Sequence, residues 1–490
     1  MTVSFNDIPS TIRVPLVYVE FDNARAVQGT PGIEHKMLVI GQKHSSGLAD
    51  AGVPIRITSV SQAEEAFGRT SMLAEMFTTL KAANRYIESW AIPLADASGL
   101  QAAGKITITG NATDTGTLAV YIAGHQVLLG VTAGNSNNTM ASALAVAINA
   151  IDRVPVLATV DGTNLNEVIL TCNWKGETGN GIDIRFNYYQ GELYPAGVTV
   201  SITAMAGGTI NPDISSAITA MGDEWWNTLV MPYTDTANLN ALRDELNDRW
   251  GPTRMIDGQA YTAFKGTHAA TGTFGNGRND HLVSCMGTGE SPTPPYIWAV
   301  VNAGIAAASI SIDPARPLQT LPLTGILPPK IEDRWTMEER NLLLYDGIST
   351  FNVNAGGQVQ IERQITTYQK NSFGLADPSY LDVNTPATLS YIRYATRARI
   401  TQKFPRYKLA DDGTRVGPGQ AIVTPSVIRD ELLALFRELE EKGLVENFDQ
   451  YKTDLLVERN ADDPNRVDVL SSPDLVNQFR IFAEKIQFIV

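Results

Sequence analysis

The stretch from Thr424 to Val490 limits the possible folds of this chain more than any other part of it. It closes on large apolar residues, at Phe479, Ile481, Phe482, Ile486, Phe488, Ile489 and Val490. Chain ends usually fray, and exposed apolar side chains are unfavourable in water. We therefore expect residues 479–490, here called the C-terminal arm, to form a strand. It would pair either with the chain's own sheet or with the sheet of a neighbouring molecule.

The same stretch opens with a well-marked helix. Thr424 is a suitable N-cap, Pro425 suits the first helical turn, and Gly443 suits a left-handed C-terminal position. Apolar residues recur at helical spacing and predict one buried face, formed by Ile428, Leu432, Leu435, Phe436 and Leu439. The other face is charged and includes Arg429, Arg437, Glu438, Glu440, Glu441 and Lys442. Two strands should follow at 452–459 and 466–470, around an Asp-Asp-Pro-Asn turn.

Length and composition indicate a folded, acidic, multidomain protein. A chain of 490 residues is too long for one core, and 43 % hydrophobic against 18 % charged residues excludes disorder. Its 38 basic and 52 acidic residues give a net charge of −14, which disfavours binding to nucleic acid. Cys172 and Cys285 are interpreted as buried thiols. The apolar run at 296–312 predicts a buried helix rather than a membrane span, so we expect no membrane insertion.

The N-terminal segment predicts a second strand-forming arm. Residues 12–21 are strongly strand-prone, and Pro15 restricts them to an edge position because it cannot donate to a ladder. Val14, Leu16 and Tyr18 are its candidate contact residues. A Gly/Pro-containing connector follows, and we place the boundary of this arm at residue 34.

The rest of the chain predicts an α/β (α+β) multidomain fold with mixed α/β core domains. Strands and helices alternate over 35–99 and again over 209–330, which we interpret as one discontinuous domain. They include a capping pair at Ser61 and Glu64, a strand at 254–260 and a Gly/Thr/Asn-rich loop over 272–277. Residues 100–208 carry seven short strand signals and one small helix, so they predict an inserted β-rich domain. We expect residues 331–490 to form the fourth part, a C-terminal assembly domain with a terminal β arm.

A search for catalytic motifs finds none. The sequence lacks a phosphate-binding loop, a dinucleotide fingerprint, a zinc-protease motif and a nucleophile elbow. The five histidines share no ligand spacing, and the paired aspartates lie where turns are expected. We therefore expect no catalytic residue, no cofactor and no metal.

Several segments resemble the tail sheath proteins of contractile, Mu-like bacteriophages. They are Pro294-Pro-Tyr-Ile-Trp298 before an Ala-rich helix, Asp313-Pro-Ala-Arg-Pro-Leu318, and Asn341-Leu-Leu-Leu-Tyr-Asp-Gly-Ile348. The long helix from Pro386 and the final order of helix, acidic turn and strand complete the likeness, which covers about 1–100 and 210–490. Specificity comes from the order of these segments along the chain, because none of them is catalytic.

The resemblance implies a non-enzymatic subunit that polymerises with itself as hexameric rings in a helical sheath around a tail tube protein. It further implies baseplate and tail terminator proteins as partners, a place in the virion after assembly in the host cytoplasm, and contraction that drives genome ejection. Such subunits are joined by their arms through β-augmentation, and a C-terminal-domain helix faces the tube. That places the charged face of 426–442 toward the tube and makes Phe479, Ile481, Ile486, Phe488 and Val490 contact residues of the C-terminal arm.

Two alternatives stay open at this point. The chain could instead belong to a baseplate, or to the sheath of a tailocin or secretion system. From another class, it could be a cytosolic α/β enzyme with residues 272–277 as its active-site lid.

Overall fold

The computed structural model describes residues 32–415, 417 and 419–489. The N-terminal arm, with Val14, Leu16 and Tyr18, and the final residue Val490 lie outside the described residues. The chain divides into two compact units. The large unit is Glu34–Ser390 together with the chain from Asn477 onward, and the small unit is built on Tyr391–Val476. The four-domain division stays a prediction, since a compact unit can hold more than one domain.

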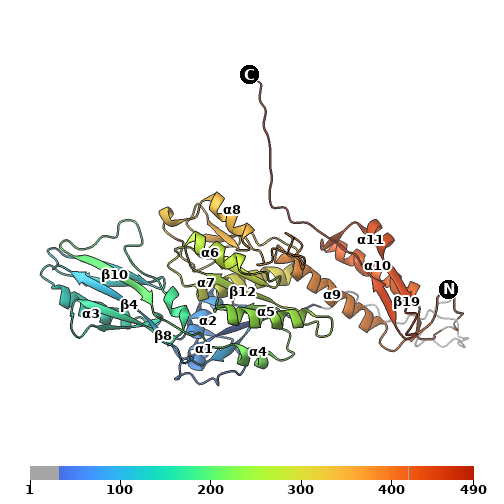
Figure 1. Cartoon of the computed structure of the whole chain (residues 1–490), viewed down its shortest axis with the longest axis horizontal. Helices are drawn as coiled ribbons and strands as arrows, with labels where there is room; N and C mark the ends of the chain where they lie inside the picture. Colours follow the sequence, from blue (N-terminus) through green and yellow to red (C-terminus); the bar gives the residue numbers. More distant parts are fainter. Residues whose placement is uncertain (1–31, 416, 418, 490) are drawn as a thin grey trace, which may run out of the picture. The chain divides into compact units, whose positions relative to one another are not determined.

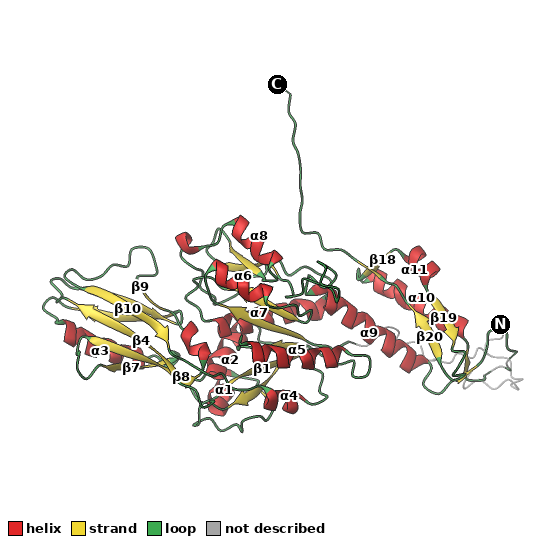
Figure 2. Ribbon diagram, viewed as in Figure 1, coloured by secondary structure: helices red, strands yellow, loops and turns green. Residues whose placement is uncertain are grey.

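A six-stranded sheet forms the centre of the large unit (Figures 1 and 2), in the order β13-β12-β11-β1-β3-β2. Five strands are parallel and β2 is antiparallel to β3. Their bounds are β1 Lys36–Gln42, β2 Ile55–Arg56, β3 Glu88–Leu94, β11 Thr228–Val230, β12 Gln259–Phe264 and β13 Val283–Gly287. Strands β1, β12 and β13 are buried along almost their whole length, as expected where helices cover a parallel sheet.

Helices connect and cover these strands. In helix α7 twelve of eighteen residues are buried, and the helix packs against α2, β11 and β12. Among the described residues α7 is the one helix long and apolar enough to cross a membrane, yet most of it lies inside this core, as predicted for a buried helix. The helices are α1 Val60–Phe67, α2 Met72–Ala83, α4 Ser215–Met221, α5 Thr236–Trp250, α6 His268–Asn276 and α7 Pro295–Ile312.

All seven strands expected over residues 100–208 are present, together with the small helix. They form two antiparallel sheets, β10-β4-β8-β7 and β6-β5-β9. The bounds are β4 Gln101–Thr109, β5 Gly116–Ile122, β6 His125–Val131, α3 Asn137–Asn149, β7 Val156–Val160, β8 Glu167–Lys175, β9 Ile184–Phe186 and β10 Thr199–Ala206, with a 3-10 turn at Glu177–Gly181. Strand β8 alternates buried and half-buried residues along its length, as a sheet with one covered face requires.

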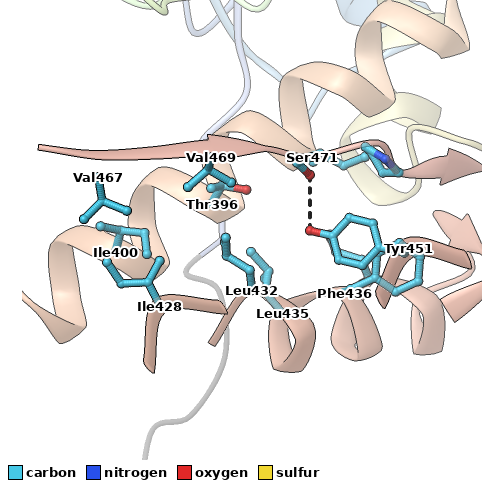
Figure 3. Close-up of a pocket in the computed structure, with 13 residues that line it drawn as sticks. Thr396, Ile400, Ile428, Leu432, Leu435, Phe436, Tyr451, Val467, Val469 and Ser471 are labelled. Carbon is cyan, nitrogen blue, oxygen red and sulfur yellow. Dashed lines mark hydrogen bonds between the residues drawn. The ribbon is translucent and has the colours of Figure 1, made fainter. Parts of the chain in front are cut away.

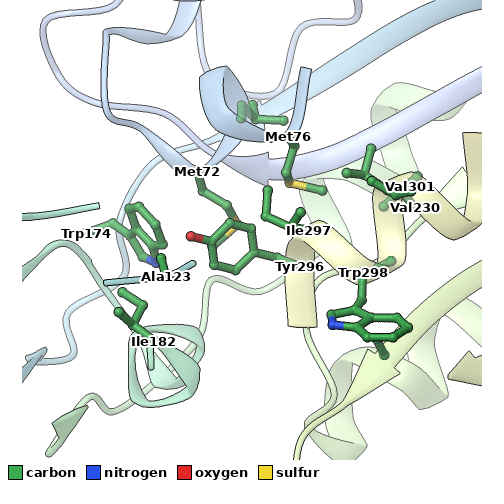
Figure 4. Packing of buried hydrophobic residues seen from close by; sticks show 14 of the residues in the cluster. Met72, Met76, Ala123, Trp174, Ile182, Val230, Tyr296, Ile297, Trp298 and Val301 are labelled. Carbon is green, nitrogen blue, oxygen red and sulfur yellow. The ribbon is translucent and has the colours of Figure 1, made fainter. Parts of the chain in front are cut away.

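The β-rich region shares its apolar core with the rest of the large unit. Figure 4 shows Trp174, Ala123 and Ile182 of this region beside Met72 and Tyr296 of the central helices. The rings of Trp174 and Tyr296 meet edge to face with centroids 5.5 Å apart.

The rest of the large unit follows the predicted order. Helix α8 (Met337–Tyr345) begins with the predicted capping box, in which Thr336 and Glu339 bond each other's backbone. Strands β14 (Thr350–Val353) and β15 (Val359–Arg363) form the expected antiparallel hairpin. A 3-10 turn at Ile331–Asp333 precedes α8.

The small unit packs three helices with short strands. Helix α9 (Asn384–Lys403) starts in the large unit and continues into the small unit, where α10 (Pro425–Glu441) carries the predicted buried stripe. The remaining elements are β16 Lys408–Leu409, β17 Ile422–Val423, β18 Val445–Glu446, α11 Phe448–Asp454, β19 Leu456–Arg459, β20 Val467–Leu470 and β21 Asp474–Leu475. Gly443 has φ of 69°, the left-handed conformation expected after α10.

Four local predictions were wrong. Residues 452–454 end helix α11 rather than start a strand, because Phe448 and Tyr451, three positions apart, both pack on Phe436 of α10. Helix α1 is capped by Ser59, whose side chain accepts from the backbone of Gln62, so the capping pair lies two residues earlier than expected.

The other two errors concern the start of strand β12 and the helix that follows it. Strand β12 begins at Gln259, since the segment before it is irregular and Met255 has positive φ. The glycine-rich stretch at 272–277 lies largely in helix α6 and is not a loop, because its glycines allow close packing. A Cβ at Gly275 would lie 2.1 Å from the carbonyl oxygen of Asp346.

Candidate assembly site

The C-terminal arm pairs with no strand of this chain among the residues the structure describes. Beyond β21 the chain has neither helix nor strand through Ile489, and Figure 1 draws it as a single extended trace. Its large side chains stay exposed, with exposed fractions of 73 % for Phe479, 81 % for Ile481, 76 % for Ile486 and 82 % for Phe488. Such a run of exposed apolar residues is typical of an interaction segment. In the described residues the arm therefore does not pair with the chain's own sheet, and pairing with the sheet of a neighbouring molecule stays a prediction.

The small unit contains an apolar groove of about 240 Å³. Its walls are side chains of α9, of α10 and of strand β20, and Figure 3 shows Ile400, Ile428 and Leu432 facing Val467 and Val469. The lining residues are Ile392, Thr396, Ile400, Ile428, Leu432, Leu435, Phe436, Leu439, Tyr451, Val467, Val469, Ser471 and Pro473.

Polar groups are few in this groove, and two of them bond each other. The hydroxyls of Tyr451 and Ser471 lie 3.2 Å apart, and burial raises the pKa of Tyr451 above its usual value. The ring of Tyr451 stacks on Phe436 with centroids 4.1 Å apart. An apolar groove next to a strand can take up an apolar segment in extended conformation, because side chains fill the groove while backbone groups pair.

Strand β20 borders this groove and has one strand partner among the described residues. It pairs antiparallel with β19, from Val467 opposite Arg459 to Leu470 opposite Leu456. The two strands form a sheet of their own, so each keeps an edge without a strand partner within the described part of the chain. Such an edge offers unpaired N–H and C=O groups to an added strand.

The charged face of α10 makes many contacts within the small unit. Arg429 donates to the backbone carbonyls of Lys452 and Leu455, and the Arg437 guanidinium lies 3.3 Å from the ring centroid of Phe448. Arg437 also pairs with Glu440 at 2.6 Å. These contacts hold α10 to α11, so two of the predicted tube-facing cations also position their own helix.

The remaining residues of that face differ in how far they are engaged. Glu438 pairs with Arg399 of α9, and Lys442 donates to the Tyr391 hydroxyl at 2.6 Å. Glu441 is exposed.

Sequence reasoning missed the contribution of α9. Arg399 is 9 % exposed and lies between Glu438 and Glu431, which also pairs with Lys403 at 2.7 Å. Ile392, Thr396 and Ile400 of the groove are spaced by four residues. That helical spacing was a usable signal for the groove-facing side of α9.

The interior of the large unit offers no support for a lid or a reactive thiol. The proposed lid residues lie in helix α6, packed against Asp346 and Ile348. Burial raises the pKa of the Cys172 thiol to about 12 and that of Cys285 further, so neither is a thiolate at neutral pH. Both cysteines are free and buried, as the sequence predicts. No group of three or more metal-ligating side chains occurs in the described residues.

Comparison with known proteins gives the class of this fold. Residues 207–367 match the phage tail sheath protein central domain and residues 376–489 match the phage tail sheath C-terminal domain. The chain belongs to the phage tail sheath family, whose members are structural subunits of contractile tails. Within it, this chain is of the Mu-like kind. It is 54 % identical over 491 residues, the full length of both chains, to the Mu-like prophage FluMu tail sheath protein of Haemophilus influenzae.

A solved structure shares the fold. The sheath tail protein of Desulfitobacterium hafniense is 14 % identical, with a TM-score of 0.50 over 94 % of this chain and 97 % of that chain. The sheath tail protein of Listeria innocua is 12 % identical, with a TM-score of 0.48 over 92 % of this chain and 93 % of that chain. The multidomain α/β class expected from the sequence is confirmed, and so is the structural role in a contractile tail sheath.

Proposed function

We propose that this sheath subunit joins its neighbours by donating its C-terminal arm to the small unit of a second copy. The observation that carries the proposal is an arm of exposed apolar residues in a chain that also has an apolar groove beside a free strand edge. The added strand would pair with the open edge of the β19–β20 sheet. Alternate side chains of the arm would then enter the groove, each buried Phe or Ile contributing about 1.5–3 kcal/mol.

Arm donation suits a polymer that must rearrange without falling apart. Ladder hydrogen bonds add roughly 0.5–1.5 kcal/mol each, so several of them with the apolar contacts hold two subunits while the connecting chain turns. We propose that the subunits form hexameric rings stacked in a helical sheath around a tail tube protein. Baseplate and tail terminator proteins would bind its two ends. The sheath would assemble in the host cytoplasm, become part of the virion tail and contract to drive the tube through the host envelope, with no catalytic step of its own.

Electron microscopy of the purified protein tests the arm. The double variant Ile486→Ser and Phe488→Ser changes two alternate residues of the arm and should give soluble, folded subunits that no longer form tubes. Tyr86→Ser is the matched control, because Tyr86 is 95 % exposed and lies outside the arm. Normal tubes from the double variant would refute arm donation.

We further propose that the exposed acids near the end of α10 contact the tail tube. Glu441 is the best single test, since Glu438 is engaged with Arg399. Glu441→Lys should weaken co-assembly with purified tubes at low salt and leave self-assembly unchanged, because exposed ion pairs contribute only about 0–1 kcal/mol each. Asp463→Lys in the exposed turn before β20 is the control. Equal co-assembly of the parent and the Glu441 variant would exclude this contact.

A further inference from the structure

The residues at the base of the C-terminal arm are attached to the large unit. The side-chain amide of Gln478 donates to the carbonyl oxygen of Ala315 at 3.1 Å. In return, the amide of Gln319 donates to the carbonyl oxygen of Phe479 at 3.3 Å. We call residues 478–480 the arm root. Its partners, Ala315 and Gln319, lie in the segment between α7 and α9, so two hydrogen bonds attach the arm root to the large unit.

Arg480 reverses the pattern of exposure along the arm. Its charged side chain is only 12 % exposed, while the apolar neighbours Phe479 and Ile481 are 73 % and 81 % exposed. Charged side chains are seldom buried unless they are paired. Arg480 is paired, since its Nη2 lies 2.9 Å from Oδ1 of Asp382.

Asp382 is suited to hold Arg480 and also to release it. The carboxylate is already bound by Arg363, whose Nε and Nη2 each lie 3.1 Å from one of its oxygens. Such a two-point contact between a guanidinium and a carboxylate is stable by itself. Departure of Arg480 would therefore leave no unpaired carboxylate, which is the costly outcome when a partly buried ion pair is broken. Asp382 is also fixed by its backbone, which bridges to Ile365 just before α9.

We propose that Arg480 and Asp382 form a clamp that fixes where the C-terminal arm leaves its own subunit, and so sets the reach of the arm toward a neighbour. The proposal rests on the proposed function, in which the arm is donated. With the clamp closed, the ten residues beyond Arg480 can span at most about 33–36 Å. Arg480 is thus a positioning residue, and the apolar residues beyond it make the contact.

Opening the clamp would lengthen the free segment. If the hydrogen bonds of Gln478 to Ala315 and of Gln319 to Phe479 break with it, the next attachment toward the N-terminus is the backbone hydrogen bond from Val476 to Leu444, at 3.2 Å. Residues 477–490 would then be free, fourteen in place of ten. Effective concentration falls roughly as the −3/2 power of tether length, so each arm contact would weaken about 1.7-fold. The critical concentration for assembly should rise by at least that factor.

Limited proteolysis of the unpolymerised full chain tests the clamp directly. Trypsin should cut readily after Lys485 but slowly after Arg480, because Arg480 is held. Asp382→Asn removes the negative charge, so cleavage after Arg480 should become about tenfold faster, equivalent to about 1.4 kcal/mol. Cleavage after Lys485 should not change. Glu362→Gln is the matched control, since it breaks the similarly exposed pair with Arg340 elsewhere in the large unit. Unchanged cleavage after Arg480 would overturn the proposal.

A second variant covers the case in which Asp382→Asn does not fold. Arg480→Gln leaves the Asp382–Arg363 pair intact, and chymotrypsin then replaces trypsin. Cutting after Phe479 should accelerate relative to cutting after Phe482. An unchanged ratio would equally refute the clamp.

The critical concentration for tube assembly distinguishes the proposal of the clamp from the proposal of arm donation. The clamp variants should form tubes only at higher concentration than the parent. Open clamps in the protease assay with an unchanged critical concentration would show that Arg480 does not position the arm. Normal tubes after loss of the arm contacts would refute arm donation, and the protease result would still decide whether the clamp exists.

Discussion

Replacing Arg399 by Ala should destabilise the small unit and leave the large unit unchanged. Arg399 is 9 % exposed and serves Glu438 and Glu431, the latter at 3.6 Å. Removing one partner of a buried ion pair costs about 3–5 kcal/mol, whereas an exposed ion pair contributes only about 0–1 kcal/mol. Here the carboxylates of Glu438 and Glu431 are 37 % and 22 % exposed, and Glu431 remains paired with Lys403 in the variant. We therefore expect the free energy of unfolding to fall by about 1.5 kcal/mol. For a unit of this size that lowers the melting temperature by about 6–12 °C.

The two units can be followed separately, because all seven tryptophans lie in the large unit. Thermal unfolding recorded by tryptophan fluorescence therefore reports the large unit, whereas circular dichroism at the helical band reports both. The expected result is a shift in the dichroism transition with an unchanged fluorescence transition. Arg397→Ala, at an exposed position of the same helix, is the control and should change neither. Equal shifts by both probes, or no shift by either, would refute the reasoning.

Three further predictions concern the large unit. Gly275→Ala places a Cβ 2.1 Å from the Asp346 carbonyl oxygen and should lower the free energy of unfolding in urea by about 1–3 kcal/mol. Gly277→Ala, whose Cβ would lie 3.3 Å from its nearest atom, should lower it less. Equal losses for the two variants would contradict close packing at Gly275. Tyr296→Phe removes the 2.6 Å hydrogen bond to the buried Glu75 carboxylate and should cost about 1.5–3 kcal/mol, while Tyr86→Phe at an exposed site should cost nothing measurable. Burial raises the pKa of Cys172 in the folded state from 9.0 to about 12, so the contribution of the neutral thiol to stability is complete below pH 9 and is lost as the pH rises from 9 to 12. At pH 8 a thiol reagent should modify Cys172 in urea but not in the native protein. Rapid labelling of Cys172 in the native protein would contradict its burial.

Short-range signals in the sequence were sufficient for most elements of the fold. Thr336 and Glu339 form a capping box whose partners are three residues apart, so it is visible without a structure. The buried stripe of α10 and the alternation in β8 likewise depend on spacing along one element. The segment order that identified the family is also a property of the sequence alone.

Contacts between distant parts of the chain decided the rest. Helix α11 takes up residues 452–454, the first part of a predicted strand, because Tyr451 stacks on Phe436, and the glycines of α6 are required by the approach of Asp346. Nothing in the apolar segment around Arg480 indicates from sequence that this residue pairs with Asp382. Arg399 is one of several basic residues along α9, so the sequence does not indicate that it is the one that pairs with Glu438. Local propensity and periodicity describe one element at a time. Which charges meet, and which edges stay open, depends on how the elements pack, because packing brings together residues whose spacing in the sequence carries no information about their contact.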